Sequence, residues 1–230
     1  MDAHLTGVRS DDVDDCIKAT GDTVIRVCSR IIKLYPKNAS AYYNRGVAYH
    51  NKLQYDRAIA DYDMAISLNP KYASAYLNRG AVYGYKGDYD RVIADYTQAI
   101  KLSPKIAGTY IKRGRAYSNK LQYDRAIADY TQAIKLSPRF ALAYINRGRA
   151  YYKKGQYDLA IADHTQAIKF GWKKTQDYFV QIWVHYLNRG ITYYKKGDKE
   201  RAIADFSKVL ELRPGEPLTT NYLKRLGVTP

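Results

Sequence analysis

A step of 34 residues recurs along the chain and limits its possible folds more than any other feature. Glycine and proline both follow it, at Gly46, Gly80, Gly114 and Gly148 and at Pro36, Pro70, Pro104 and Pro138. If the glycine is numbered position 8 of each copy, positions 4, 8 and 11 share one helix face, and positions 20, 24 and 27 share another. Proline ends the second helix because it lacks a backbone N–H. Each copy is therefore predicted to be a pair of helices joined by a short turn.

The residue types at these positions repeat as consistently as their spacing. Tyrosine occupies positions 4 and 11, alanine or valine positions 20 and 27, and an aromatic ring or histidine position 24. This order of residues and its period resemble the tetratricopeptide repeat family. The chain departs from that family at position 4, where tryptophan is common, and at position 7, where arginine replaces a common leucine. The resemblance implies an all-α fold, a right-handed α-solenoid superhelix of helix–turn–helix repeats with helical caps.

The period divides the chain into five repeats between two caps. We expect an N-terminal helical cap or partial repeat at 1–36 and a C-terminal capping helix at 215–230. The five repeats are expected at 37–70, 71–104, 105–138, 139–172 and 173–214. Atypical terminal units are usual in repeat proteins, because they cover the ends of the stack. In the C-terminal cap, the spacing predicts that Leu218, Tyr222, Leu223 and Leu226 point inward.

The fifth repeat carries an insertion of eight residues, because its glycine lies 42 residues after the preceding one. Within 170–190 we expect a first helix that is lengthened at its N-terminus and capped by Thr175. The aromatic residues of the insertion have two interpretations. Tyr178, Phe179 and Trp183 either pack against the fourth repeat or form a lip on a binding groove.

The balance of charge points to acidic partners. The chain of 230 residues carries 38 lysines and arginines against 22 aspartates and glutamates, a formal net charge of +16. Residues 105–214 hold 22 of the basic and 9 of the acidic side chains, so the surplus lies mainly in the third to fifth repeats. A surplus of this kind favours association with acidic molecules and does not specify a fold.

Cys16 and Cys28 leave two interpretations open. They are either two small core residues in a reducing compartment or a disulfide between two antiparallel helices. The chain as given has no signal peptide and no apolar run of about 18 residues that could span a membrane. The repeats and the cysteine pair resemble exported bacterial members of the family, which favours an exported protein with its signal removed over a cytoplasmic one.

No arrangement of residues in the sequence points to catalysis. The four histidines are not clustered with carboxylates or cysteines at metal-ligand spacing. Phosphate-binding glycine loops and hydrolase motifs are absent as well. We therefore expect a protein that is not an enzyme and that needs neither a cofactor nor a metal. His164 stands at position 24 and is expected to pack in the core.

Nine residues are candidates for a peptide-binding groove. The resemblance implies that the first helices line a concave face, which receives positions 6, 9 and 13. An asparagine amide can pair with the backbone of an extended peptide, although asparagine is also an ordinary residue on a solvated face. Basic side chains join the amides in the third to fifth repeats. The candidates are Asn44, Asn78, Lys112, Arg115, Asn146, Arg149, Lys153, Asn188 and Lys195.

These features predict a non-enzymatic scaffold that binds a peptide or helix of an acidic partner protein. One alternative is binding of single-stranded nucleic acid through the basic groove, since tyrosine is abundant and aromatic rings stack on bases. Most tyrosines, however, occupy positions that the helix core already requires. The other alternative is a purely structural module that assembles with itself.

A second charge pattern has an architectural interpretation. Position 7 is arginine and position 23 is aspartate in all five repeats. We expect each arginine to pair with the aspartate of its own repeat, in place of the leucine contact that is usual in the family. The predicted pairs are Arg45–Asp61, Arg79–Asp95, Arg113–Asp129, Arg147–Asp163 and Arg189–Asp205.

Overall fold

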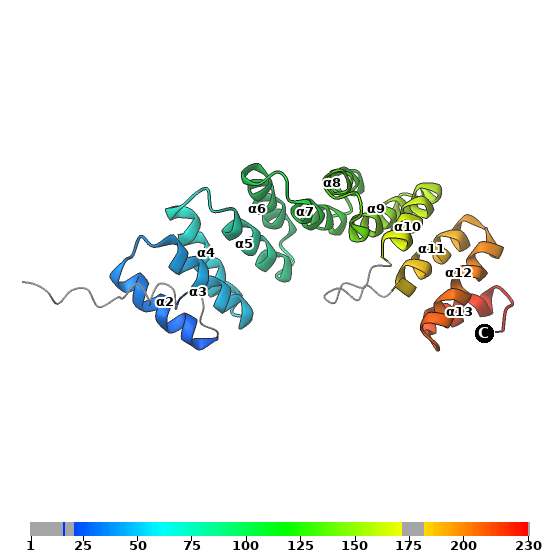
Figure 1. Cartoon of the computed structure of the whole chain (residues 1–230), viewed down its shortest axis with the longest axis horizontal. Helices are drawn as coiled ribbons and strands as arrows, with labels where there is room; N and C mark the ends of the chain where they lie inside the picture. Colours follow the sequence, from blue (N-terminus) through cyan, green and yellow to red (C-terminus); the bar gives the residue numbers. More distant parts are fainter. Residues whose placement is uncertain (1–15, 17–20, 172–181, 230) are drawn as a thin grey trace, which may run out of the picture. The chain divides into compact units, whose positions relative to one another are not determined.

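The protein is helical throughout the residues that the computed structural model describes, which are residue 16, residues 21–171 and residues 182–229. Figure 1 shows the helices following one another along the chain. Their bounds are α2 (Asp22–Leu34), α3 (Ala39–Asn51), α4 (Tyr55–Leu68), α5 (Ala73–Tyr85), α6 (Tyr89–Leu102), α7 (Ala107–Asn119), α8 (Tyr123–Leu136), α9 (Ala141–Lys153), α10 (Tyr157–Phe170), α11 (Ile182–Lys196), α12 (Lys199–Leu212) and α13 (Pro217–Arg225). The predicted all-α fold of consecutive helix pairs is confirmed. No helix in these residues combines the length and the apolar character that crossing a membrane requires.

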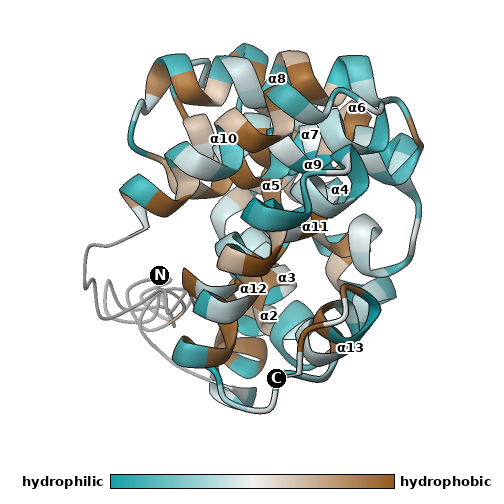
Figure 2. Ribbon diagram, turned by 90° about the vertical axis from the view of Figure 1, so that its right-hand side faces the viewer, coloured by the Kyte–Doolittle hydropathy of each residue, from teal (hydrophilic) through white to brown (hydrophobic). Residues whose placement is uncertain are grey.

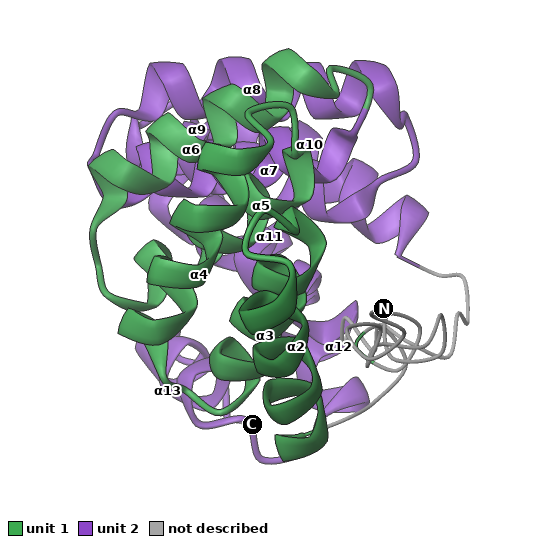
Figure 3. Ribbon diagram, turned by 90° about the vertical axis from the view of Figure 1, so that its left-hand side faces the viewer, with its two compact units in different colours: residues 1–105 green, residues 106–230 purple. Residues whose placement is uncertain are grey.

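The helices group into two compact units, Met1–Lys105 and Ile106–Pro230, which Figure 3 colours separately. In unit 1, α3 pairs with α4 and α5 pairs with α6. In unit 2, the pairs are α7 with α8, α9 with α10 and α11 with α12. Successive pairs within a unit also pack together, through α4 and α5 in unit 1 and through α8 and α9, and α10 and α11, in unit 2. These five pairs are the five copies of the sequence period.

The turn inside each pair passes through one residue in the left-handed region of backbone space. Glycine holds this place at Gly87, Gly155 and Gly197, with φ values of 75°, 74° and 89°. Leu53 and Leu121 hold it in the remaining two turns, each with φ of 60°. This conformation is unfavourable for leucine because its Cβ crowds the following carbonyl oxygen. The Lys-Leu-Gln turns therefore copy the glycine geometry without glycine.

Close contact between paired helices explains the glycine at position 8. A Cβ built on Gly114 would lie 2.6 Å from Cε1 of Tyr130, and one on Gly46 would lie 2.8 Å from the matching atom of Tyr62. Both tyrosines occupy position 24 and are buried, as are the alanines at positions 20 and 27. Figure 2 shows apolar and polar segments alternating along the helices, in keeping with one buried face each.

A disulfide between Cys16 and Cys28 closes the core at the start of unit 1. It is one of the two arrangements that the sequence left open. Cys28 stands at position 24 of the partial repeat and is completely buried, so the disulfide fills space that a ring fills in the other repeats. It packs with Ile31 and Ala41 of α2 and α3. Of the part of the predicted N-terminal cap that precedes Gly21, only Cys16 is among the described residues.

The C-terminal helix α13 corrects one expectation. Leu218 was predicted to point inward, but it is 44% exposed, whereas Thr219 is completely buried. The side chain of Glu216 accepts a hydrogen bond from the backbone N–H of Thr219 and so fixes where the helix begins. The inward face then runs through Thr219, Leu223 and Leu226 at the i, i+4, i+7 spacing of a helix.

The insertion before α11 is described only in part. Thr175, Tyr178 and Phe179 lie outside the described residues. Trp183 is half-buried and packs with the apolar cluster that contains Leu187. The guanidinium of Arg213 lies 4.4 Å from the centre of the Trp183 ring.

Candidate partner-binding face

The arginine at position 7 forms a two-bond ion pair in every repeat. Each guanidinium donates one hydrogen bond from Nε and one from Nη2 to the two carboxylate oxygens of the aspartate at position 23, over 2.6 to 2.9 Å. The structure thus contains the pairs Arg45–Asp61, Arg79–Asp95, Arg113–Asp129, Arg147–Asp163 and Arg189–Asp205. The aspartates are 4 to 5% exposed. A planar guanidinium suits this fork geometry, which lysine could not provide.

A third hydrogen bond from these arginines reaches the preceding repeat. Nη1 of Arg45 donates to Ser29, that of Arg147 to Thr131 and that of Arg189 to Thr165, over 3.0 to 3.1 Å. The acceptors share position 25 of the preceding copy. One arginine therefore joins three helices, a contact that the sequence analysis did not predict.

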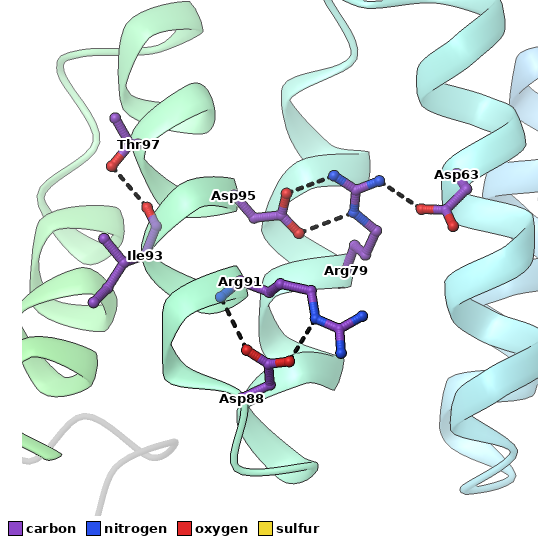
Figure 4. A network of polar contacts seen from close by, with 7 residues as sticks. All are labelled: Asp63, Arg79, Asp88, Arg91, Ile93, Asp95 and Thr97. Atoms are coloured by element: carbon purple, nitrogen blue, oxygen red, sulfur yellow. Dashed lines mark hydrogen bonds and ion pairs between the residues drawn. The ribbon is translucent and has the colours of Figure 1, made fainter. Parts of the chain in front are cut away.

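Arg79 differs from the other arginines at position 7 because its third hydrogen bond goes to a carboxylate, that of Asp63. Figure 4 shows its guanidinium between Asp95 and Asp63, which accepts from Nη1 at 2.5 Å. Burial lowers the pKa of Arg79, but the two carboxylates outweigh burial and hold its pKa above the ordinary value. Burial raises the pKa of Asp95, the bonds from Arg79 lower it, and the charge of Asp63 raises it again, so that its pKa is raised overall.

The tyrosines at positions 4 and 11 flank the same guanidinium groups. The guanidinium carbon of Arg147 lies 5.7 Å from the ring centre of Tyr144 and 5.9 Å from that of Tyr151. The corresponding tyrosines lie 5.5 to 6.0 Å from the arginine in the other four repeats. Cation–π contacts of this kind add to the attraction between arginine and ring. The repeated tyrosines thus belong to the internal architecture.

Lysines near the turns form another set of ion pairs between repeats. The lysine at position 14 pairs with the aspartate at position 18 of the preceding copy, as in Lys52–Asp22, Lys86–Asp56, Lys154–Asp124 and Lys196–Asp158. The last pair spans 38 residues instead of 30, and Arg189 reaches Thr165 across 24 residues instead of 16. The insertion of eight residues therefore leaves both kinds of contact in register.

The two candidate asparagines of unit 1 already have neighbours. Nδ2 of Asn78 donates to the hydroxyl of Tyr43 at 3.0 Å. Nδ2 of Asn44 lies 3.9 Å from Sγ of Cys16, in the disulfide. Both side chains are half-buried. In these contacts the amides hold neighbouring elements of unit 1 together.

The other seven candidates belong to unit 2. Asn146 and Asn188 are half-buried in α9 and α11. The remaining five are exposed, and we call them the basic face: Lys112, Arg115, Arg149, Lys153 and Lys195, carried by α7, α9 and α11. None of the five forms an ion pair with a carboxylate in the described part of the chain. Their charges are open to a partner, unlike those of the arginines at position 7.

Two buried histidines lie between the fourth and fifth repeats. His164 takes the place of the usual ring at position 24 and is 1% exposed, and His185 of α11 is completely buried. Burial lowers the pKa of His164 to about 3, and the neighbouring His185 and then the charges of Arg149 and Arg189 lower it further. Burial lowers the pKa of His185 to about 4. Both rings are therefore neutral near pH 7. His164 was expected in the core, whereas no periodic pattern marked His185.

Comparison with known proteins agrees with this architecture. The family model described as "Tetratricopeptide repeat" matches residues 39–72, 73–106, 141–170 and 184–216, and a second model, "TPR repeat", matches residues 122–155. No curated protein matches the chain.

Solved structures share the fold at low sequence identity. YrrB, described as "a TPR protein with an unusual peptide-binding site", is 22% identical, with a TM-score of 0.71 over 86% of this chain and 97% of its own. A C-terminal part of a repeat protein from Cytophaga hutchinsonii gives a TM-score of 0.75 at 20% identity, over 93% and 83% of the two chains. MamA from Desulfovibrio magneticus RS-1 gives 0.65 at 20% identity, over 73% and 94%. With family models matching more than half of its length, the chain belongs to the tetratricopeptide repeat family.

Proposed function

We propose that this protein is a non-enzymatic scaffold that binds an acidic segment of a partner protein on the basic face of unit 2. The observation that supports this is the contrast between two sets of basic side chains. The arginines at position 7 are satisfied by buried aspartates, whereas the five cations of the basic face are exposed and have no described carboxylate partner.

Binding of an anion to the basic face costs little free energy. An exposed cation without an internal partner loses no existing ion pair when a carboxylate approaches it. Several such cations on neighbouring helices also attract an acidic chain from a distance and raise its association rate. Peptide recognition has a precedent within this fold, since YrrB is described as having a peptide-binding site.

The amides on the same helices have a secondary role in this proposal. Asn146 and Asn188 stand one turn before the position 9 residues on α9 and α11. An amide offers both a donor and an acceptor to a peptide backbone. We assign the asparagines to backbone pairing and the basic side chains to recognition of acidic residues.

Selection from a library of short random peptides on the immobilised full chain tests the proposal. We expect enrichment of peptides rich in aspartate and glutamate. A triple charge reversal of Arg149→Glu, Lys153→Glu and Lys195→Glu should abolish that enrichment. The matched control reverses Lys135, Lys199 and Lys224, which are exposed outside the basic face and change the net charge equally.

Two results would contradict the proposal. One is selection of neutral peptides, and the other is an equal loss of acidic peptides in both triple variants. Titration with a single-stranded oligonucleotide at two salt concentrations tests the alternative function, which is binding of nucleic acid. If the oligonucleotide binds tightly, with a steep salt dependence, and the triple reversal of the basic face abolishes that binding, the partner is a nucleic acid and not a peptide.

A further inference from the structure

Asn146 has lost the hydrogen-bond partner that its equivalent in unit 1 possesses. Asn78 donates to the hydroxyl of Tyr43, which stands at position 5 of the preceding repeat. The residue at that place before Asn146 is Ile111, which has no acceptor. Nδ2 of Asn146 is accordingly buried without a hydrogen bond to any described residue. A buried donor without an acceptor is costly and calls for an explanation.

Two arginines of the basic face are carried by α7 and α9 in this part of unit 2. Arg149 follows Asn146 by three residues on α9, so that the two side chains share a helix face. Arg115 holds the matching position on α7. The buried hydroxyl of Tyr130 lies 3.1 Å from Oγ of Ser118. Burial raises the pKa of Tyr130, whereas the bond with Ser118 and then the positive charges of Arg115 and Arg149 lower it.

Arg115, Arg149 and Asn146 all carry hydrogen-bond donors, and no anionic side chain of the described residues accepts from them. Neither guanidinium has a carboxylate partner among the described residues. The missing partner is a carboxylate. The adjacent arginines Arg113 and Arg147 each bind the carboxylate of an aspartate through two hydrogen bonds.

We propose that this place between α7 and α9 is a subsite for one side-chain carboxylate of an acidic partner peptide. The carboxylate accepts hydrogen bonds from Arg115 and Arg149, and from Asn146 after its amide turns about the Cβ–Cγ bond. That turn breaks no hydrogen bond, because none to a described residue involves the Asn146 side chain in this structure. The inference rests on the proposed function and narrows it from a basic face to three named residues.

The test is a titration of the ¹⁵N-labelled full chain, followed by NMR, with a capped tetraglutamate peptide and its tetraglutamine counterpart. The side-chain amide signal of Asn146 is assigned by its loss in Asn146→Leu. We expect this signal to shift and saturate with the glutamate peptide only. Arg115→Gln, Arg149→Gln and Asn146→Leu should each weaken binding about tenfold, the usual worth of one charge-assisted hydrogen bond. Lys135→Gln, which removes an exposed charge elsewhere in unit 2, should leave the affinity unchanged.

The outcomes separate this subsite from the proposed function. If the glutamate peptide binds and the triple reversal of the basic face abolishes binding, but none of the three single variants weakens it, the subsite is wrong and the function stands. If the glutamate peptide does not bind at all, both are wrong. If inorganic phosphate shifts the Asn146 signal at the same concentration as the peptide, the assignment to a carboxylate is overturned. Urea unfolding midpoints no lower than that of the wild type show that the variants are folded.

Discussion

Replacing Arg79 by leucine tests the architectural role of the arginine at position 7. Leucine is the residue that the family commonly places there, so its size and helix propensity suit the site. The change leaves the carboxylate of Asp95, which is 4% exposed, without its two hydrogen bonds, and it also removes a cation from beside Asp63. Removing one partner of a buried ion pair costs about 3–5 kcal/mol, because the remaining charge stays buried. We expect a loss of this size in the free energy of unfolding.

The pH dependence of this loss gives a second, independent readout. The folded-state pKa of Asp95 is already raised, mainly by burial, and losing Arg79 raises it further. A carboxyl group with a raised folded pKa is penalised when it is ionised, so the penalty is present at neutral pH. It disappears as the pH falls through the folded pKa towards the unfolded value. The deficit of Arg79→Leu relative to the wild type should therefore shrink between pH 7 and about pH 4.

Urea unfolding followed by far-ultraviolet circular dichroism measures both effects. Arg91→Leu is the matched control, because it makes the same substitution in the same unit at an exposed pair with Asp88, and we expect it to leave stability unchanged. The double variant Arg79→Leu, Asp95→Leu should recover most of the loss, since it leaves no buried charge. A loss below about 1 kcal/mol in Arg79→Leu, or no recovery in the double variant, would refute the idea that these arginines neutralise buried aspartates.

Three further substitutions follow from the same repeat geometry. Leu121→Gly should raise the unfolding free energy by about 0.5–1 kcal/mol, because it relieves a left-handed leucine at some cost in chain entropy, and a lower urea midpoint would contradict it. Gly114→Ala should lower stability by about 1–3 kcal/mol through the collision with Tyr130, as measured by urea unfolding, and a neutral result would mean that the ring can move away. The histidines have folded pKa values below the unfolded value of about 6.5, so the unfolded state takes up protons first and stability is lost as the pH falls below 6.5. His164→Phe should remove roughly 2 kcal/mol of the loss between pH 7 and 5, and an unchanged pH profile would show that His164 titrates normally.

The sequence predicted features that depend on position within one repeat. The paired helices follow from the spacing of apolar residues, and the charged residues at positions 7 and 23 lie in contact as predicted. Features that depend on the next repeat were missed. The bonds from the arginines to Ser29, Thr131 and Thr165 require the packing of one hairpin on another, which a single period does not reveal.

Exceptions to the period were the hardest features to predict. Leu53 adopts a backbone conformation that its residue type disfavours, so residue preference alone does not predict it. Leu218 points outward because Glu216 fixes the start of α13, a capping contact that shifts the buried face by one residue. The unpartnered amide of Asn146 depends on a tyrosine that is present in one repeat and replaced by isoleucine in another.

The contacts between repeats bear on how such a gene can change its length. In the described contacts within a unit, the arginine at position 7 binds the residue at position 25 of the preceding copy, and the lysine at position 14 binds the aspartate at position 18. These contacts persist where eight extra residues intervene. Recombination that adds or removes one whole copy within a unit would give the arginine at position 7 and the lysine at position 14 equivalent acceptors on the new neighbour. Intermediates with more or fewer copies would then fold with these contacts intact. Relatives with other numbers of copies should accordingly keep the lysine at position 14 and the aspartate at position 18 together, or lose both.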